Sequence, residues 1–194
     1  SESEIPNGVK IINFGSDSGN HVYFENNSIY NNRNKIIDRK DIPLIGKGNI
    51  ENVMAAISVG IALNCDPNKI NKAIKKFKSL PHRLEFIGEF NGIKYYNDSI
   101  STVPESAIHA LEGLKEKGEL VEVLIVGGFD KGGDYEILGK FLGKFENLRH
   151  VAIFPETGSK ILEFYRKNNP KQNISFHNVS DMNSAVGICK KYCS

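Results

Sequence analysis

The sequence predicts an α/β protein in which a domain with a mostly parallel sheet and helices on both faces follows a smaller region of short strands and two helices. Two observations predict this class. From about residue 104 onward, helical runs alternate with short apolar runs typical of buried strands, and such alternation forms parallel, Rossmann-like sheets. Before residue 80, strand-like runs separated by Asn, Gly and Ser turns favour a small antiparallel sheet.

Composition excludes several classes of function. At 194 residues and 40% hydrophobic, the chain can bury one large or two small cores. The 25 basic and 23 acidic residues are spread along it, so we expect no nucleic-acid partner. Cys65, Cys189 and Cys193 form no Cys-x-x-Cys pair, which indicates reduced thiols in the cytoplasm. The longest apolar run, residues 53–63, is too short to cross a bilayer, so we expect no membrane partner. We also expect a monomer.

The first region has four runs with strand composition, which are residues 9–14, 21–25, 28–30 and 35–38. A helix is predicted over residues 49–63, because Ile50, Val53, Ile57 and Ile61 then share one face. Asp66 and Pro67 supply an N-cap and a first-turn proline for a second helix that runs to Phe77.

The second region begins with a hairpin, residues 84–90 and 93–96, around an Asn91-Gly92 turn of type I′. Helices are predicted over residues 104–115, 135–145, 159–167 and 183–192, and strands over residues 121–126, 151–154 and 174–176. Ligands of such sheets gather outside the carboxyl ends of the strands. The loops at residues 97–102 and 127–134 are therefore the candidate site.

The segment Gly46-Lys47-Gly48-Asn49-Ile50-Glu51-Asn52 begins the first predicted helix. Backbone N–H groups at a helix N-terminus and the amides of Asn49 and Asn52 can face a nucleotide. A plainer alternative is that Asn49 is the N-cap and Asn52 an exposed polar residue.

His82 and Arg83 start the hairpin, and Asp98 follows it. A guanidinium forms paired hydrogen bonds to phosphate oxygens and keeps its charge. The alternatives are a solvated basic pair and, for Asp98, a turn-forming residue. Thr102 begins a Thr-Val-Pro-Glu capping box for the next helix and can also line a site, and Ser99 adds a hydroxyl.

Residues 126–134, Val-Gly-Gly-Phe-Asp-Lys-Gly-Gly-Asp, follow the most apolar predicted strand. Glycine pairs allow positive φ and let the backbone approach a ligand closely. Alternatively, this is a flexible loop in which Asp134 caps the next helix. His109, His150 and His177 lack metal-ligand spacing and are predicted to be separate surface residues.

Three motifs in this order resemble the Mur ligases. They are P-H-R-x-E at residues 81–85, N-D-S-x-x-T at residues 97–102, and G-G-x-x-K-x-x-D-[FY] at residues 127–135. Residues 46–52 resemble the family's G-x-H-N-x-x-N segment. Within the family, the wording is most similar to the branch that adds D-glutamate.

The resemblance implies a role for each matching residue. Asn49, Asn52, His82, Arg83 and Asp98 would bind the nucleotide: the asparagines contact ATP, the arginine its phosphates, and the aspartate its ribose.

On the D-glutamate side, Lys131 would meet the carboxylate of the incoming amino acid, together with Thr102 and Ser99, and Lys131 and Thr102 are the implied catalytic residues. Two positions depart from the family pattern: Gly48 replaces its usual histidine, and Ile100 replaces the lysine of its best-known loop.

The resemblance also implies an activity and a domain organisation. A Mur ligase of this branch uses ATP and Mg²⁺ to join D-glutamate to UDP-N-acetylmuramoyl-L-alanine through an acyl phosphate, in peptidoglycan synthesis. Residues 1–80 would end the central ATPase domain, and residues 81–194 would form most of the C-terminal domain. Both ends look cut, and the G-x-x-x-x-G-K-[ST] loop and magnesium-binding residues would lie upstream. We therefore expect the chain alone to be inactive. The alternatives are another Mur ligase, a folylpolyglutamate synthetase-like ligase, or a non-catalytic nucleotide-binding module.

Overall fold

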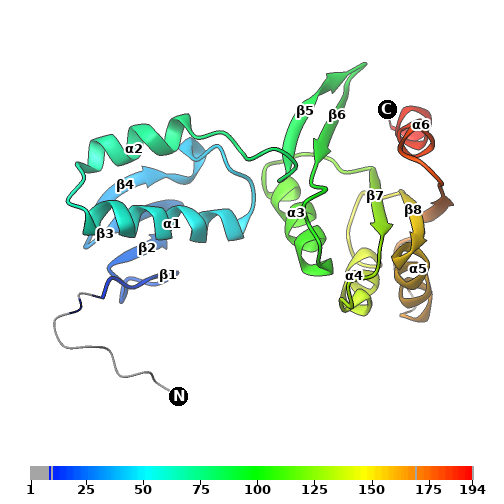
Figure 1. Ribbon diagram of the computed structural model, residues 1–194, viewed down its shortest axis with the longest axis horizontal. Helices are drawn as coiled ribbons and strands as arrows, with labels where there is room; N and C mark the ends of the chain where they lie inside the picture. The colour runs from blue at the N-terminus through cyan, green and yellow to red at the C-terminus, as the bar shows by residue number, and fades with distance from the viewer. Residues whose placement is uncertain (1–8, 10, 169, 194) are drawn as a thin grey trace. The chain divides into compact units, whose positions relative to one another are not determined.

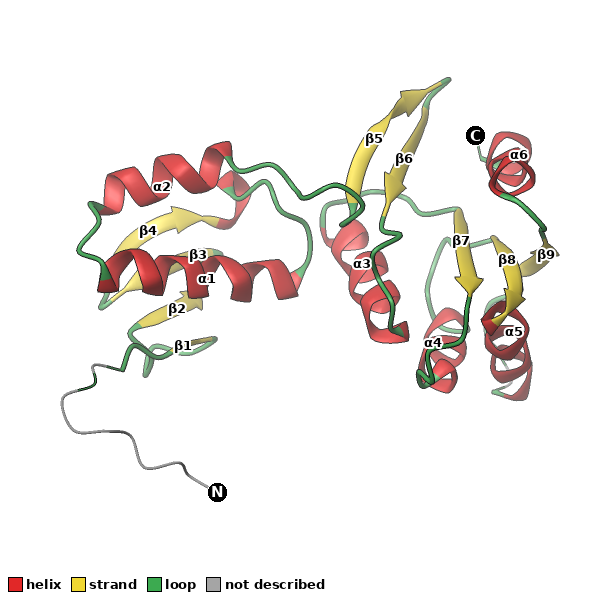
Figure 2. Cartoon of the chain, viewed as in Figure 1, coloured by secondary structure: helices red, strands yellow, loops and turns green. Residues whose placement is uncertain are grey.

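The chain divides into two compact units, Ser1–Lys78 and Ser79–Ser194. The structure, a computed structural model, describes residues 9, 11–168 and 170–193. Figure 1 labels most of the helices and strands of each unit, and Figure 2, which also labels β9, colours the chain by secondary structure.

The first unit contains a sheet of order β1-β2-β3-β4. Its strands are β1 (Phe14–Gly15), β2 (Val22–Glu25), β3 (Ser28–Asn31) and β4 (Asn34–Asp38). The last three strands pair antiparallel as predicted, but β1 pairs parallel with β2. The strand predicted at residues 9–14 was wrong in extent: Val9 and Ile11 are 55% and 46% exposed, so the apolar run buries no face. Residue 10 of that run lies outside the described residues.

A short 3-10 helix (Arg39–Asp41) leads to α1 (Lys47–Ala62) and α2 (Pro67–Lys76) of the first unit. Asp66 caps α2 as predicted, because its carboxylate accepts the Asn68 N–H. The core between sheet and helices contains apolar side chains from both layers: Val22, Ile29, Ile36, Ile37, Ile42, Ile50, Val53, Met54 and Ile57.

The second unit begins with the antiparallel hairpin β5 (Glu85–Phe90) and β6 (Ile93–Asn97), followed by α3 (Pro104–Glu116). Asn91 and Gly92 both have positive φ, as the predicted type I′ turn requires. The carboxylate of Glu119 accepts hydrogen bonds from the Lys94 ammonium and the Tyr96 hydroxyl, at 2.8 and 3.1 Å. Burial and this neighbouring carboxylate raise the pKa of Tyr96 to about 12. These bonds join the hairpin to the segment that follows α3.

The rest of the second unit is a parallel sheet of order β7-β8-β9. Its elements are β7 (Val123–Gly128), α4 (Tyr135–Leu142), β8 (His150–Glu156), α5 (Thr157–Lys167), β9 (Ser175–Asn178) and α6 (Met182–Tyr192). Figure 1 shows α4 and α5 side by side next to β7 and β8.

Helices cover both faces of this sheet, as predicted. Val151 and Ile153 of β8 pack with residues of α4 and α5, whereas the intervening Ala152 packs with Ala185 of α6. This alternation follows from the two-residue period of a strand. Helix α4 ends at Leu142, three residues before the predicted end. No helix in the described part of the chain is long and apolar enough to span a membrane.

Candidate functional site

The loop after β6 is organised around the Asp98 carboxylate. Its Oδ1 accepts the Leu84 N–H at 2.7 Å, and its Oδ2 accepts the Ser101 hydroxyl at 2.6 Å. The Ile100 N–H donates to the His82 carbonyl at 3.2 Å. Asp98 therefore holds the turn that precedes β5 against the loop that follows β6. The predicted roles of a turn-forming residue and a ligand-binding residue are compatible here.

The basic pair lies in the same turn. The amide nitrogen of Asn97 lies 2.8 Å from His82 Nδ1, within hydrogen-bond distance. The Ser79 hydroxyl donates to the Arg83 carbonyl at 2.5 Å, while the exposed Arg83 guanidinium has no hydrogen bond or ion pair within the described residues. The structure thus brings the predicted His82, Arg83 and Asp98 together and leaves the guanidinium available to a ligand.

Thr102 and Ser99 are exposed at this loop. The predicted capping box was wrong: α3 begins at Pro104, and its N-cap is Val103, without a side-chain hydrogen bond. Proline fits the first helical position because its missing N–H would be unpaired there in any case, and the Thr102 hydroxyl is left outside the helix. The Ser99 N–H donates to the Asn97 side chain at 3.0 Å.

The glycine-rich loop after β7 depends on close packing at Gly127. This residue has a φ of 117°, and a Cβ there would lie 2.8 and 2.9 Å from the carbonyl oxygen and nitrogen of Phe154 in β8. A larger residue would collide with backbone atoms. The Thr157 hydroxyl of α5 donates to the Gly128 carbonyl at 3.0 Å. The start of the loop is therefore fixed against β8 and α5.

The tip of this loop is held by Asp130, which the sequence did not single out. Its carboxylate accepts hydrogen bonds from the Lys160 ammonium, the Gly132 N–H at 2.8 Å and the Tyr135 hydroxyl at 2.9 Å. Its own N–H donates to the Glu156 carboxylate at 3.2 Å. The Lys160 ammonium, followed by the other two donors, lowers the pKa of Asp130 to about 2. Lys160 lies 30 positions further along the chain, and no local pattern marks it.

Lys131 lies between two anchored neighbours. Asp130 and Gly132 are joined by the hydrogen bond just described, while the Lys131 side chain is exposed and has no partner among the described residues. Asp134 caps α4 by accepting the Glu136 N–H at 3.0 Å, as predicted. The loop therefore presents a free ammonium from a fixed backbone.

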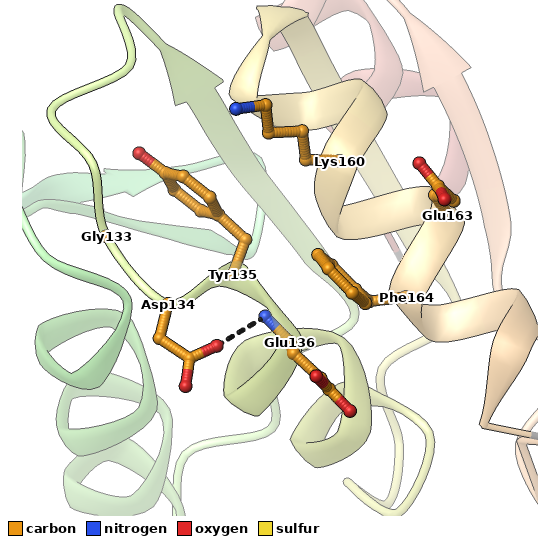
Figure 3. Close-up of a pocket in the computed structure, with 7 residues that line it drawn as sticks. All are labelled: Gly133, Asp134, Tyr135, Glu136, Lys160, Glu163 and Phe164. Carbon is orange, nitrogen blue, oxygen red and sulfur yellow. Dashed lines mark hydrogen bonds between the residues drawn. The ribbon is translucent and has the colours of Figure 1, made fainter.

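A cleft of about 340 Å³ lies between the end of this loop, α4 and α5. Figure 3 shows that the Tyr135 hydroxyl and the Lys160 ammonium point to the same side of it. The ammonium lies 5.8 Å from the centre of the Tyr135 ring, within the range of a cation–π contact. The cleft is lined by Gly133, Asp134, Tyr135, Glu136, Lys160, Glu163 and Phe164.

The two loops meet at one rim of the second unit, although β6 pairs only with β5 in the hairpin and is not part of the parallel sheet whose edge the sequence predicted. A Cβ on Gly133 would lie 2.8 Å from Cδ of Pro104, the first residue of α3. The hydroxyl-rich loop ends where α3 begins, so Thr102 and Lys131 belong to adjoining segments.

Asn49 and Asn52 belong to the first unit. Helix α1 has Gly46 as its N-cap, so the alternative that Asn49 is the N-cap was wrong. The Asn49 amide donates to the Ile45 carbonyl at 2.7 Å and accepts the Asn52 amide at 3.3 Å. A side chain at Gly48 would meet no atom within 4 Å, so the space beside this helix start is open.

The prediction that His150 and His177 are separate surface residues was wrong. Their Nδ1 and Nε2 atoms lie 3.1 Å apart, and the Tyr192 ring of α6 stacks on His150 with centroids 4.1 Å apart. Burial lowers the pKa of His177, and His150 and Lys191 add to this effect. Within the described residues, no three His, Cys, Asp or Glu side chains could hold a metal ion together.

Sequence comparison finds relatives that share one name. The chain is 38% identical over 163 residues to the UDP-N-acetylmuramoylalanine--D-glutamate ligase of Thermoanaerobacter sp. (strain X514), covering 81% of this chain and 34% of that protein. The proteins of the same name from Caldicellulosiruptor saccharolyticus and Aquifex aeolicus are 33% and 32% identical, over 88% and 75% of this chain and 37% and 34% of theirs. The chain thus spans about a third of the length of these relatives. No family model matches it.

Solved structures share the fold. MurF from Acinetobacter baumannii superposes with a TM-score of 0.72 at 19% identity, covering 94% of this chain and 40% of that one. The UDP-N-acetylmuramate-alanine ligase MurC of Thermotoga maritima gives 0.67 at 15% identity, covering 94% and 41%. The folylpolyglutamate synthase of Thermotoga maritima gives 0.55 at 20% identity, covering 82% and 37%.

Proposed function

We propose that this chain, which belongs to the Mur ligase family, is part of an ATP-dependent ligase that adds D-glutamate to UDP-N-acetylmuramoyl-L-alanine. One observation carries the proposal: the loop after β6, which is bonded to the turn of the free Arg83, adjoins the loop of the free Lys131, in a chain whose relatives are named as such ligases. Two cations held apart at one rim fit a reaction that joins a phosphorylated substrate to a dicarboxylic amino acid.

The proposed reaction has two steps. An alanine carboxylate oxygen attacks the γ-phosphorus of ATP, which releases ADP and leaves an acyl phosphate. The D-glutamate amine then attacks the acyl carbon, the tetrahedral intermediate expels phosphate, and the amine loses a proton. Little of this requires covalent chemistry from the protein, so positioning and charge stabilisation supply most of the rate enhancement.

Each residue of the second unit receives a role in this scheme. The Arg83 guanidinium binds ATP phosphates and His82 lies beside it, while Asp98 holds their turn and faces the ribose. The Lys131 ammonium binds a D-glutamate carboxylate. The exposed hydroxyls of Thr102 and Ser99 line the amino-acid side.

We assign the unit Ser1–Lys78 to the end of the central ATPase domain and the unit Ser79–Ser194 to the C-terminal domain. Asn49 and Asn52 would contact ATP beside the open start of α1. Because the chain spans about a third of its relatives, we expect it to bind ligands weakly and to release no phosphate alone. The proposed reaction also uses magnesium, and the described part of the chain contains no group of three His, Cys, Asp or Glu side chains that could hold it.

The setting follows from the proposed reaction. Its product is a peptidoglycan precursor, so the ligase would serve cell-wall synthesis in the cytoplasm and hence cell shape and division. We propose that it acts as a monomer on small molecules and binds no nucleic acid.

The test is phosphate release by the full-length parent protein with ATP, Mg²⁺ and UDP-N-acetylmuramoyl-L-alanine. D-glutamate, L-glutamate, L-lysine and diaminopimelate are compared as acceptors. We expect turnover with D-glutamate alone and a loss of roughly 100-fold in Lys131→Ala. The control is Lys140→Ala, an exposed lysine of α4 that pairs with Glu136. Turnover with another acceptor would assign a sibling ligase, and ATP binding without turnover would favour a nucleotide-binding module.

A further inference from the structure

Asp130 is the most connected polar side chain of the proposed amino-acid site, although it is not one of the proposed ligand-binding residues. Both of its carboxylate oxygens are used: Oδ1 accepts from Gly132 and Tyr135, and Oδ2 accepts from Lys160. A carboxylate with this many donors has little remaining capacity to bind a substrate. Its contacts instead determine where the adjoining backbone lies.

The residue whose backbone is fixed is Lys131. The Asp130 N–H is bonded to Glu156, and the Gly132 N–H is bonded to Asp130, so the residues before and after Lys131 both have a hydrogen-bonded backbone N–H. The Lys131 side chain has none among the described residues. Holding the backbone and leaving the ammonium free reduces the entropy lost when this ammonium binds a carboxylate.

Lys160 supplies the cationic part of this anchor from a different element. It lies in the first half of α5, its side chain is 51% exposed, and that of Asp130 is 28% exposed. A surface ion pair of this kind contributes little to global stability. Its position matters more, because it links the loop tip to α5, which is packed against β7 and β8.

We propose that Lys160 is a positioning residue for the amino-acid substrate: acting through Asp130, it holds the backbone of Lys131 in the conformation that binds a substrate carboxylate. The substrate part of this inference rests on the proposed function. The anchoring part rests only on the contacts among Lys160, Asp130 and Gly132.

The anchoring is tested on this chain by amide hydrogen exchange measured by NMR. In Lys160→Ala, we expect exchange at the Gly132 amide to rise by about fivefold or more, because its acceptor is no longer held. Lys160→Arg keeps the charge and should restore most of the protection. The matched control is Lys167→Ala, which removes another ion-paired lysine of α5, remote from the loop. Unchanged exchange at Gly132 in Lys160→Ala would overturn the proposal.

The substrate part is tested in the full-length parent. Lys160→Ala is expected to raise KM for D-glutamate by about tenfold and to leave KM for ATP unchanged. Asp130→Asn should give the same change, and the double variant should be no worse than either single one. An equal rise in both KM values would indicate general damage and contradict the proposal. If the wild-type parent releases no phosphate with D-glutamate, the proposed function fails, and the exchange result on Gly132 still decides the anchoring.

Discussion

Asp98 and Asp130 are two carboxylates at the same rim with different partners. Asp98 follows β6 and accepts only neutral donors, the Leu84 N–H and the Ser101 hydroxyl. Asp130 follows β7 and also accepts the ammonium of Lys160. Within the described residues, no cation donates a hydrogen bond to Asp98, whereas the Lys160 ammonium balances the charge of Asp130.

The cations near these two carboxylates also differ in whether they have a partner. Arg83 and Lys131 have no side-chain partners among the described residues, while Lys160 is committed to Asp130. A loop that is to bind an anion needs a fixed backbone and a free cation, and the structure divides these tasks between two lysines. Lys131 and Lys160 are the same residue type, and it is the ion pair with Asp130 that gives Lys160 an anchoring role.

The largest loss of stability is expected from Gly127→Ala, which disrupts packing at the start of the loop that contains Asp130. The new Cβ would lie within 3 Å of the Phe154 backbone, at a φ that side chains rarely adopt. We expect the free energy of unfolding to fall by about 3 kcal/mol, measured by urea denaturation. The control Gly187→Ala, in α6 with no atom near its Cβ, should instead stabilise the chain by up to about 1 kcal/mol. Equal effects of the two changes would contradict the assigned packing.

A smaller loss is expected from Asp98→Ala, which removes the acceptor of the Leu84 N–H. Leaving this donor and the Ser101 hydroxyl without their partner should cost about 1–2 kcal/mol of unfolding free energy, again measured in urea. Asp98→Asn keeps one acceptor oxygen and should lose less. Ser99→Ala, which removes an exposed hydroxyl, is expected to change stability by less than about 0.5 kcal/mol. A neutral result for Asp98→Ala would show that the carboxylate does not hold the turn.

The histidine pair gives a pH response in a different range from that of the carboxylates. The lowered pKa of His177 means that the unfolded chain binds a proton more readily, so stability should fall as pH drops below about 6.5. The groups facing His177 are His150, Tyr192 and Lys191. His177→Phe keeps an aromatic ring and removes the titration. Between pH 5 and 7.5, the melting temperature of this variant should depend less on pH than that of the unsubstituted chain. An identical dependence would exclude His177 as the cause of the loss of stability.

The fold was largely predictable because strand and helix periods and turn residues are local properties. The loops of Asp98 and Lys131 could be located for the same reason, since each follows a recognisable strand, whereas the choice of Lys131 within its loop came from the resemblance to the family motif. The Asp130–Lys160 contact could not be predicted, because it joins residues 30 positions apart that only the packing of α5 brings together. The Thr102 capping box failed because Pro104 fits the first helical position better than the second.

The smallest effect on stability is expected from Lys160→Ala. This substitution also tests most directly how Asp130 differs from Asp98. In the unsubstituted chain, Asp130 has a pKa of about 2. Its contacts are therefore intact at pH values above the ordinary pKa of an Asp carboxyl, and they are lost as the pH falls through 2. Without the ammonium, this pKa should rise toward 3.8, and the loop should lose its anchor at higher pH. NMR titration of the Asp130 side-chain carboxyl carbon measures this change. We expect the midpoint of the Asp130 titration to rise in Lys160→Ala and to stay in place in Lys167→Ala, which removes another ion-paired lysine of α5. An unchanged midpoint in Lys160→Ala would show that the ammonium does not distinguish Asp130 from Asp98, and the division of tasks between the two carboxylates would have to be abandoned.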